Sequence, residues 1–236
     1  MVMHRIFEIY GQKIINTLTN KIHYIELLAR PKAVLKASDI ESFFANLNEE
    51  LGFAWFSYQM NCAEDVYRIA KKRCTVNLDY NVMKVLLHDE VILNSHVLPV
   101  VLEITNIQHQ QADEPDLFTQ VLSKYSDRHH VTWALDDYNL QNIDDVTALL
   151  QQKNFTCVKL DYTIVQRLRI DPTGETKRLL TEFRALAREH QVSVIVEGIE
   201  TAADERNFQQ VGYFIFQGFL YHKPEPIRDL IHDLAK

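Results

Sequence analysis

Residues 192–198 read VSVIVEG, an apolar run rich in valine and isoleucine that ends at a carboxylate. The run lacks the strict polar alternation of a strand that has one face in water. It therefore predicts a strand that is covered on both faces, as in a parallel sheet. Runs of the same kind recur along the chain, at Cys74–Leu78, Val100–Thr105, Val131–Leu135 and Cys157–Leu160.

Amphipathic helical patterns lie between these runs. Asp39–Leu51 places apolar residues at spacings of three and four, with Ser38 as the expected N-cap. Further patterns cover Asp116–Tyr125, Thr176–His190, Thr201–Val211 and Ile227–Ala235. This alternation predicts an α/β architecture with right-handed crossovers. The number of strand candidates favours a (β/α)8-like, TIM-type barrel, with an open sheet as the alternative. We expect a single domain over residues 1–236.

Composition narrows the functional classes. The 236 residues carry a formal net charge of -7, which does not suit a nonspecific binder of duplex nucleic acid. The three cysteines, Cys62, Cys74 and Cys157, form no CxxC pair, so neither a disulfide framework nor a structural zinc site is expected. The first ten residues lack an apolar signal core, and no uncharged run reaches membrane-spanning length. We therefore expect a cytoplasmic protein without a membrane span.

Polar residues stand at or near the ends of successive predicted strands. They are Glu26, Asn77, Glu103, Asp136 with Asp137, Lys159 with Asp161, Glu197, and Gln217. In a parallel barrel the strand C-termini open onto one face, where these side chains would meet. Several carboxylates in one place repel unless a cation is present, and oxygen ligands suit Mg²⁺ or Mn²⁺ better than zinc. The alternative for any one of them is a helix N-cap or a solvated surface residue, as for Asp136 and Asp137.

Eight short segments follow one another in the order of the motifs of a known family. They are FEIYGQKIIN at Phe7–Asn16, ELLAR at Glu26–Arg30, NL at Asn77–Leu78, EIT at Glu103–Thr105, DDY at Asp136–Tyr138, KLD at Lys159–Asp161, EGIET at Glu197–Thr201, and QGF with KP at Gln217–Phe219 and Lys223–Pro224. Together they resemble the EAL domain, the bacterial phosphodiesterase module that opens cyclic di-GMP to linear pGpG. The resemblance implies the EAL variant of the barrel.

The resemblance also implies a role for each matching residue. Metal ligands would be Glu26, Asn77, Glu103 and Asp136, with Asp137, Asp161 and Glu197 at a second metal position. Lys159, Glu197 and Gln217 would form the catalytic set, in which Lys159 holds or polarises the attacking water. Substrate contacts would come from Arg30, Gln12 and Glu200. Two Mg²⁺ or Mn²⁺ ions could activate water and stabilise the leaving oxygen of a phosphoryl displacement.

The chain departs from the family pattern in one region. The family's D-D-F-G-T-G reads DDYNLQ here, and the second Glu of E-[IL]-T-E is Asn106. In the family these elements link the dimer interface to the metal site, so the loop is expected to follow another path. The implied function is metal-dependent hydrolysis of cyclic di-GMP, with a homodimer and a regulatory protein as further expected partners. The alternatives are a catalytically weak or silent relative, acting as a cyclic di-GMP receptor or protein-binding regulator, and a barrel enzyme for another phosphoester.

Overall fold

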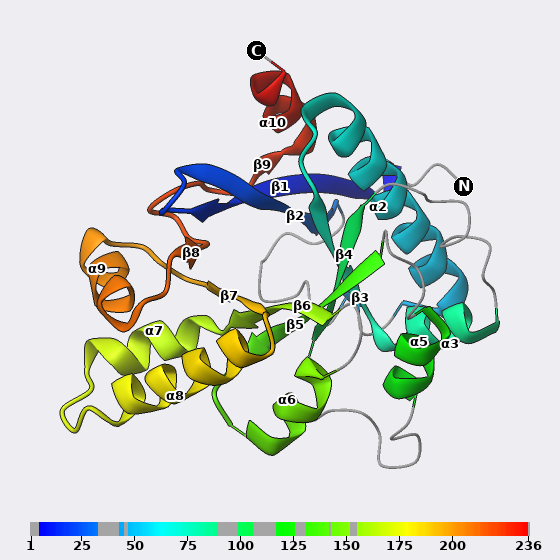
Figure 1. Ribbon diagram of the computed structural model, residues 1–236. Coiled ribbons are helices and arrows are strands. Elements are labelled where there is room, and N and C mark those ends of the chain that lie inside the picture. Colours follow the sequence, from blue (N-terminus) through cyan, green and yellow to red (C-terminus); the bar gives the residue numbers. More distant parts are fainter. Residues whose placement is uncertain are drawn as a thin grey trace.

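The protein forms a closed barrel of strands with helices around it (Figure 1). The computed structural model describes residues 5–32, 43–44, 47–88, 99–105, 117–125, 131–141, 143–151 and 155–235. The strands are β1 (Phe7–Asn16), β2 (Lys21–Pro31), β3 (Cys74–Leu78), β4 (Val100–Thr105), β5 (Val131–Tyr138), β6 (Phe155–Leu160), β7 (Ser193–Val196), β8 (Ile215–Phe216) and β9 (Glu225–Pro226). The predicted TIM-type barrel is therefore confirmed.

Among the described strands of the barrel, β1 alone is reversed, and it closes the barrel. From β2 to β8 every neighbouring pair is parallel, but β1 pairs antiparallel with β2 on one side and with β8 on the other. A short turn at residues 17–20 joins β1 to β2, and Asn20 adopts a left-handed backbone with φ 51°. So short a link leaves no room for a crossover helix, which forces the two strands to run in opposite directions. The short β9 pairs antiparallel with β1 at Tyr10 and Gly11, away from the residues of β1 that pair with β8.

The helices cover the outside of the barrel. They are α2 (Glu49–Ala70), α3 (Tyr80–His88), α5 (Leu117–Tyr125), α6 (Ile143–Leu150), α7 (Tyr162–Arg169), α8 (Glu175–Glu189), α9 (Ala202–Val211) and α10 (Ile227–Leu234). The patterns predicted for α5, α8, α9 and α10 are confirmed to within one residue at each end. Thr201 caps α9 as expected, in a reciprocal pair with Asp204. The helix predicted over Asp39–Leu51, with its Ser38 cap, lies mostly outside the described residues.

Two apolar regions account for the packing. The larger lies between strands and helices and includes Trp55, Trp133 and Phe183, all nearly inaccessible to solvent. The smaller fills the barrel itself and consists of Ile14, Tyr24, Val101, Ala134, Cys157 and Ile195. The barrel is therefore a packed core, and a site can form only where this packing ends, at its mouth. Among the described residues, no helix is long and apolar enough to cross a membrane.

Candidate active site

A polar layer lies directly above the apolar filling of the barrel. Side chains on a strand alternate between the two faces, so the residue two positions beyond an interior apolar residue also points inward. The residues at these positions are Glu26, Glu103, Asp136, Lys159, Glu197 and Gln217, two places after Tyr24, Val101, Ala134, Cys157, Ile195 and Ile215. Gln12 comes two places before Ile14, because β1 runs the other way. The strands thus bring most of the predicted residues to one mouth.

Lys159 lies at the centre of this layer. Its Nζ atom contacts four carboxylates: Glu26 Oε1 at 3.4 Å, Glu103 Oε2 at 3.3 Å, Asp136 Oδ1 at 2.9 Å and Glu197 Oε1 at 2.7 Å. Only 1% of its side chain is exposed. A single ammonium cannot neutralise four carboxylates, so the cluster stays strongly negative when all are ionised. This excess of buried negative charge favours the binding of a further cation.

The protonation states follow from burial and charge. Burial lowers the pKa of Lys159, but Asp136, Glu103, Glu197 and Glu26 outweigh it and hold that pKa well above its usual value. Burial raises the pKa of Glu103 well above its usual range, although Lys159 acts in the opposite direction. Burial likewise raises the pKa of Glu197 to about 8. Lys159 therefore keeps its proton at neutral pH, whereas these two carboxyls are held in the ionised form only with difficulty.

The donor set fits a hard divalent cation. Oxygen atoms of Glu26, Glu103 and Asp136 lie within 4.8 Å of one another, and so do those of Asp136, Asp137 and Glu197. The Oε1 atom of Glu103 is buried and has no hydrogen-bond partner in the described part of the chain. An unpaired buried carboxylate oxygen is costly unless a cation or a donor meets it. Two overlapping groups of oxygens are the arrangement that Mg²⁺ or Mn²⁺ would accept.

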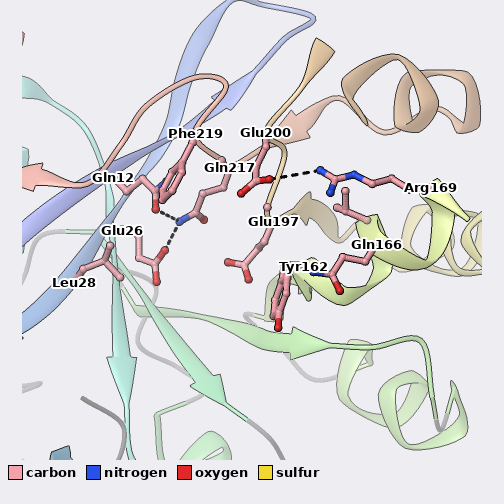
Figure 2. A pocket seen from close by; sticks show the side chains of 13 residues that line it. Gln12, Glu26, Leu28, Tyr162, Gln166, Arg169, Glu197, Glu200, Gln217 and Phe219 are labelled. Atoms are coloured by element: carbon pink, nitrogen blue, oxygen red, sulfur yellow. Dashed lines mark hydrogen bonds and ion pairs between the residues drawn. The ribbon is translucent and has the colours of Figure 1, made fainter. Parts of the chain in front are cut away.

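A chain of amides fixes one side of the cluster. Gln217 Nε2 donates to Gln12 Oε1 at 2.9 Å and also to Glu26 Oε2. Gln12 Nε2 in turn donates to the backbone carbonyl of His222 at 3.0 Å. Both amides are nearly inaccessible to solvent, and Gln217 Oε1 has no described partner. These hydrogen bonds fix the position of one oxygen of Glu26 at the side of the cluster (Figure 2).

A cavity of about 350 Å³ opens beside the cluster. Its lining includes Gln12, Glu26, Glu197, Glu200 and Gln217 from the predicted site, together with Tyr162, Gln166, Arg169 and Phe219. Figure 2 shows the side chains of Glu26, Glu197 and Gln217 directed toward a common space. Carboxylates, amides and two aromatic rings around one space can hold a molecule that has both polar and flat apolar parts.

The turn after β7 directs Glu197 into this space. Gly198 follows with φ 70°, a left-handed conformation that side chains rarely adopt. A Cβ atom at this position would lie 2.7 Å from the Cβ of Tyr162, which is closer than packed atoms allow. The glycine of the EGIET segment is thus required by both backbone and space.

Some predicted residues lie apart from the cluster. Asp161 caps α7, where its Oδ1 accepts from the backbone N–H of Thr163 at 2.9 Å. Arg30 does not line the cavity; its guanidinium donates to the carbonyl of Ala29 and lies 5.8 Å from the ring centre of Tyr10. Asn77, by contrast, is half-buried and lies next to the cluster, beside Glu103 in the pairing of β3 with β4. Asn106 lies outside the described residues.

Sequence reasoning missed Arg169, Tyr162 and Gln166 as lining residues of the cavity. All three lie on α7, directly after the KLD segment. The motif ends before the helix begins, so it gave no indication that this helix forms a wall of the cavity. The position of Tyr162, immediately after a strand-end Asp, was the one available signal.

The loop after Asp136 contains two residues other than glycine whose backbone is left-handed, a conformation that glycine adopts without strain. Asp137 and Leu140 have φ values of 52° and 64°, both in the left-handed region. Leu140 is nevertheless buried, and the carbonyl of Asn139 accepts from Arg167 at 3.2 Å. The apolar side chain and the hydrogen bond therefore hold the loop, and its left-handed residues are not Asn139 and Gln141, the two that align with the family's glycines.

Comparison with known proteins places the chain in a family. The family model described as EAL domain matches residues 3–224. The chain belongs to the EAL domain family. Among its relatives is the probable cyclic di-GMP phosphodiesterase PdeG of Escherichia coli strain K12, which is 30% identical over 135 residues, or 57% of this chain and 25% of PdeG. This EAL domain spans about a quarter or less of the length of the curated relatives that it matches.

Solved structures of EAL proteins share the fold. The manganese and cyclic di-GMP complex of BlrP1 from Klebsiella pneumoniae matches with a TM-score of 0.70 and 20% identity, over 92% of this EAL domain and 56% of BlrP1. The cyclic di-GMP complex of the PaMucR phosphodiesterase matches with a TM-score of 0.73 and 18% identity, over 95% and 99% of the two chains. At identities this low, the structural similarity establishes the barrel fold, and the chemistry of the site has to be argued from the residues of this chain.

Proposed function

We propose that this EAL domain is a divalent-metal-dependent phosphodiesterase that hydrolyses cyclic di-GMP to linear pGpG. The observation that carries the proposal is the buried ammonium of Lys159, enclosed by four carboxylates beside an open cavity. Family membership supports the substrate, because relatives such as PdeG are named as cyclic di-GMP phosphodiesterases.

The residues present fit a metal centre. Glu26, Asn77, Glu103 and Asp136 would hold the cation, with Asp137 and Glu197 toward a second position and Asp161 behind them. A bound Mg²⁺ or Mn²⁺ would supply a Lewis acid that polarises a phosphoryl oxygen and lowers the pKa of water. The neighbouring solved structures that name manganese and calcium support a divalent ion in this family.

The chain's own groups have separate tasks in the hydrolysis. The oxygen of a water molecule attacks phosphorus, and the bond from phosphorus to the ribose 3′-oxygen breaks. The departing 3′-oxygen takes up a proton from solvent to become a hydroxyl, and the linear product keeps a 5′-phosphate. Lys159 keeps its proton at neutral pH, so it stabilises negative charge near the attacking oxygen and does not act as a base. Glu197 borders both the cluster and the cavity, and in its ionised form it is placed to accept the proton of the attacking water.

The walls of the cavity would bind the rest of the nucleotide. Gln12 and Gln217 carry amides that can orient the phosphodiester, and Glu200 offers a carboxylate to the donor edge of a guanine base. Tyr162 and Phe219 are half exposed at the cavity and can stack against a base. Arg30 lies outside this lining, so its proposed phosphate contact requires a substrate that extends beyond the cavity.

A second candidate is a cyclic di-GMP receptor with little or no turnover. The loop after Asp136 favours it, because Asp137 lies in a strained, glycine-poor segment that is held by Leu140. A displaced Asp137 would weaken the second metal position without preventing nucleotide binding. A homodimer, a protein partner and a cytoplasmic location remain proposals of the same standing.

One experiment separates the two candidates. Purified protein is incubated with cyclic di-GMP and Mn²⁺ or Mg²⁺ over a range of protein concentrations, and pGpG is measured by chromatography. Metal-dependent pGpG formation that Asp136→Asn abolishes supports the phosphodiesterase. Binding of cyclic di-GMP by calorimetry without pGpG supports the receptor. If neither binding nor turnover is detected at any metal concentration, both candidates are wrong. Glu182→Gln, at a solvent-exposed ion pair on α8, is the matched control.

A further inference from the structure

A second cavity, of about 370 Å³, lies at the other end of the barrel strands. It is lined by the ends of β1 and α8 and by the segments that begin β7 and β8. Ser193 in this cavity and Glu197 in the candidate active site are four residues apart along one extended segment, which separates them by roughly 13 Å. Figure 1 shows α8 alongside β7, so the helix forms the outer wall.

Among the described residues that line this cavity, the charged side chains are both arginines. Arg184 and Arg188 lie one turn apart on α8, and no carboxylate joins them in the lining. In the described part of the chain neither guanidinium has a carboxylate oxygen within 4 Å. Two like charges at this spacing repel, and a net charge of -7 offers acidic residues in abundance elsewhere. Their shared cavity therefore has the electrostatic character of an anion site.

The backbone of Gly212 positions Arg184. Gly212 ends α9 with φ 95°, and a Cβ there would lie 2.4 Å from Cζ of Arg184. The guanidinium thus lies flat against the glycine, in space that any other residue would fill. The carbonyls of Leu186, Ala187 and Arg188 accept backbone N–H groups of residues 190–192, so the end of α8 does not require the arginines as caps.

The remaining lining is polar at one side and apolar at the other. The side-chain oxygen of Asn16 accepts hydrogen bonds from the backbone N–H groups of Leu18 and Thr19. The side-chain NH₂ group of Asn16 is left as a donor toward the cavity. The apolar lining includes Val192, Val194, Phe214 and Ile215, and Leu18 at the rim is 68% exposed. An inorganic ion would use the arginines but leave this apolar surface in water.

We propose that this cavity binds a small organic phosphate monoester, with the phosphate on Arg184 and Arg188 and an aromatic or aliphatic group against Leu18, Val194 and Phe214. Two guanidinium forks match a dianionic phosphate through charge-assisted hydrogen bonds. The volume is that of a small-molecule pocket. The site is independent of the proposed phosphodiesterase activity.

The test uses phenyl phosphate as the probe, with inorganic phosphate and phenol as separate arms, measured by calorimetry on the whole chain. Phenyl phosphate is expected to bind at least about tenfold more tightly than either arm, because only it meets both parts of the cavity. Arg184→Ala with Arg188→Ala should lower its affinity by about tenfold or more. Arg178→Ala, which removes the same charge from an exposed position of the same helix, should leave it unchanged.

Two results would overturn the proposal. Equal affinities for phenyl phosphate and inorganic phosphate would show that the apolar wall contributes nothing. An affinity that the double variant retains would place the probe elsewhere, and cyclic di-GMP as a competitor would show whether that place is the active site. The lysine variants Arg184→Lys and Arg188→Lys keep the charge and the fold but remove the planar fork, so they should weaken binding partially.

Discussion

The guanidinium of Arg169 donates to both carboxylate oxygens of Asp204, each at 2.8 Å. Asp204 is almost fully buried and also accepts from the N–H and hydroxyl of Thr201, so one carboxylate ties α7 to the start of α9. Arg169 lines the candidate active-site cavity, as does Glu200, whose carboxylate lies 3.6 Å from it (Figure 2). The pair therefore fixes the distance between two walls of that cavity.

This pair predicts a dependence of stability on pH. The hydrogen bonds from Arg169 lower the pKa of Asp204 to about 2. A lowered folded-state pKa stabilises the protein above the unfolded pKa of about 4, and this contribution is lost as pH falls from about 4 to about 2. Asp204→Asn should cost about 1–2 kcal/mol of unfolding free energy at pH 7, with allowance for the partial exposure of Arg169.

Urea denaturation of wild type and Asp204→Asn at pH 7, 4 and 2.5 measures the difference. The difference in unfolding free energy between the two proteins should become smaller as the pH falls from 4 to 2.5. A difference in unfolding free energy that stays the same at all three pH values would show that Asp204→Asn destabilises the protein through the cap of α9 and not through the lost charge.

Lys159→Met should lower both stability and turnover. The substitution keeps the length of the side chain but leaves Glu26, Glu103, Asp136 and Glu197 without their shared ammonium. Removal of one partner from a buried ionic cluster costs about 3–5 kcal/mol, and loss of the positive charge should lower turnover by about 10²-fold or more. Thermal unfolding and pGpG formation are the measurements. Lys177→Met on the surface of α8 serves as the control, and unchanged turnover would remove Lys159 from the catalytic set.

Glu103→Gln should separate stability from metal binding. Glu103 is fully buried, its pKa is raised by burial, and one of its oxygens has no described partner. A neutral amide of the same shape removes a charge that is costly to bury. Without metal, the variant should therefore have an unfolding free energy at least as large as that of the wild type. The variant should nevertheless bind Mn²⁺ about tenfold or more weakly, since an ionised ligand is lost. Calorimetric titration with Mn²⁺ tests this, and an unchanged affinity would place the metal elsewhere.

Two substitutions of Leu140, in the loop after β5, should differ in stability in a defined order. Its φ of 64° favours glycine, whereas its burial favours leucine. Leu140→Ala should cost about 2–4 kcal/mol because it creates a cavity. Leu140→Gly loses slightly more side chain but relieves the backbone by about 1 kcal/mol, so it should be no less stable than the alanine variant. Urea unfolding of both decides the point. A glycine variant clearly less stable than the alanine variant would show that the left-handed backbone costs little here.

The sequence determined most of the strands and the polar residues at their ends that carry the chemistry. Val100–Thr105 and Cys74–Leu78 match β4 and β3 residue for residue, because a strand buried on both faces leaves a continuous apolar run that little else produces. Period-two alternation then places Glu103 and Lys159 inside the barrel once the apolar residues two places earlier are placed there. The strands and their polar ends are local inferences and hold without knowledge of the fold, whereas the face that points into the barrel is known only from the structure.

Only the tertiary structure decided how these residues meet. The short turn after β1 makes it antiparallel to β2, but nothing local shows that β1 also pairs with β8, or that Gln12 therefore reaches Gln217, 205 positions away in sequence. The same holds for α7, whose Arg169 and Tyr162 line the cavity because β6 and β7 are adjacent, and for the meeting of Arg184 with Gly212 below the barrel. Closure of the barrel sets these distances, and closure depends on the whole order of the strands, whereas burial and alternation depend on a few neighbouring residues.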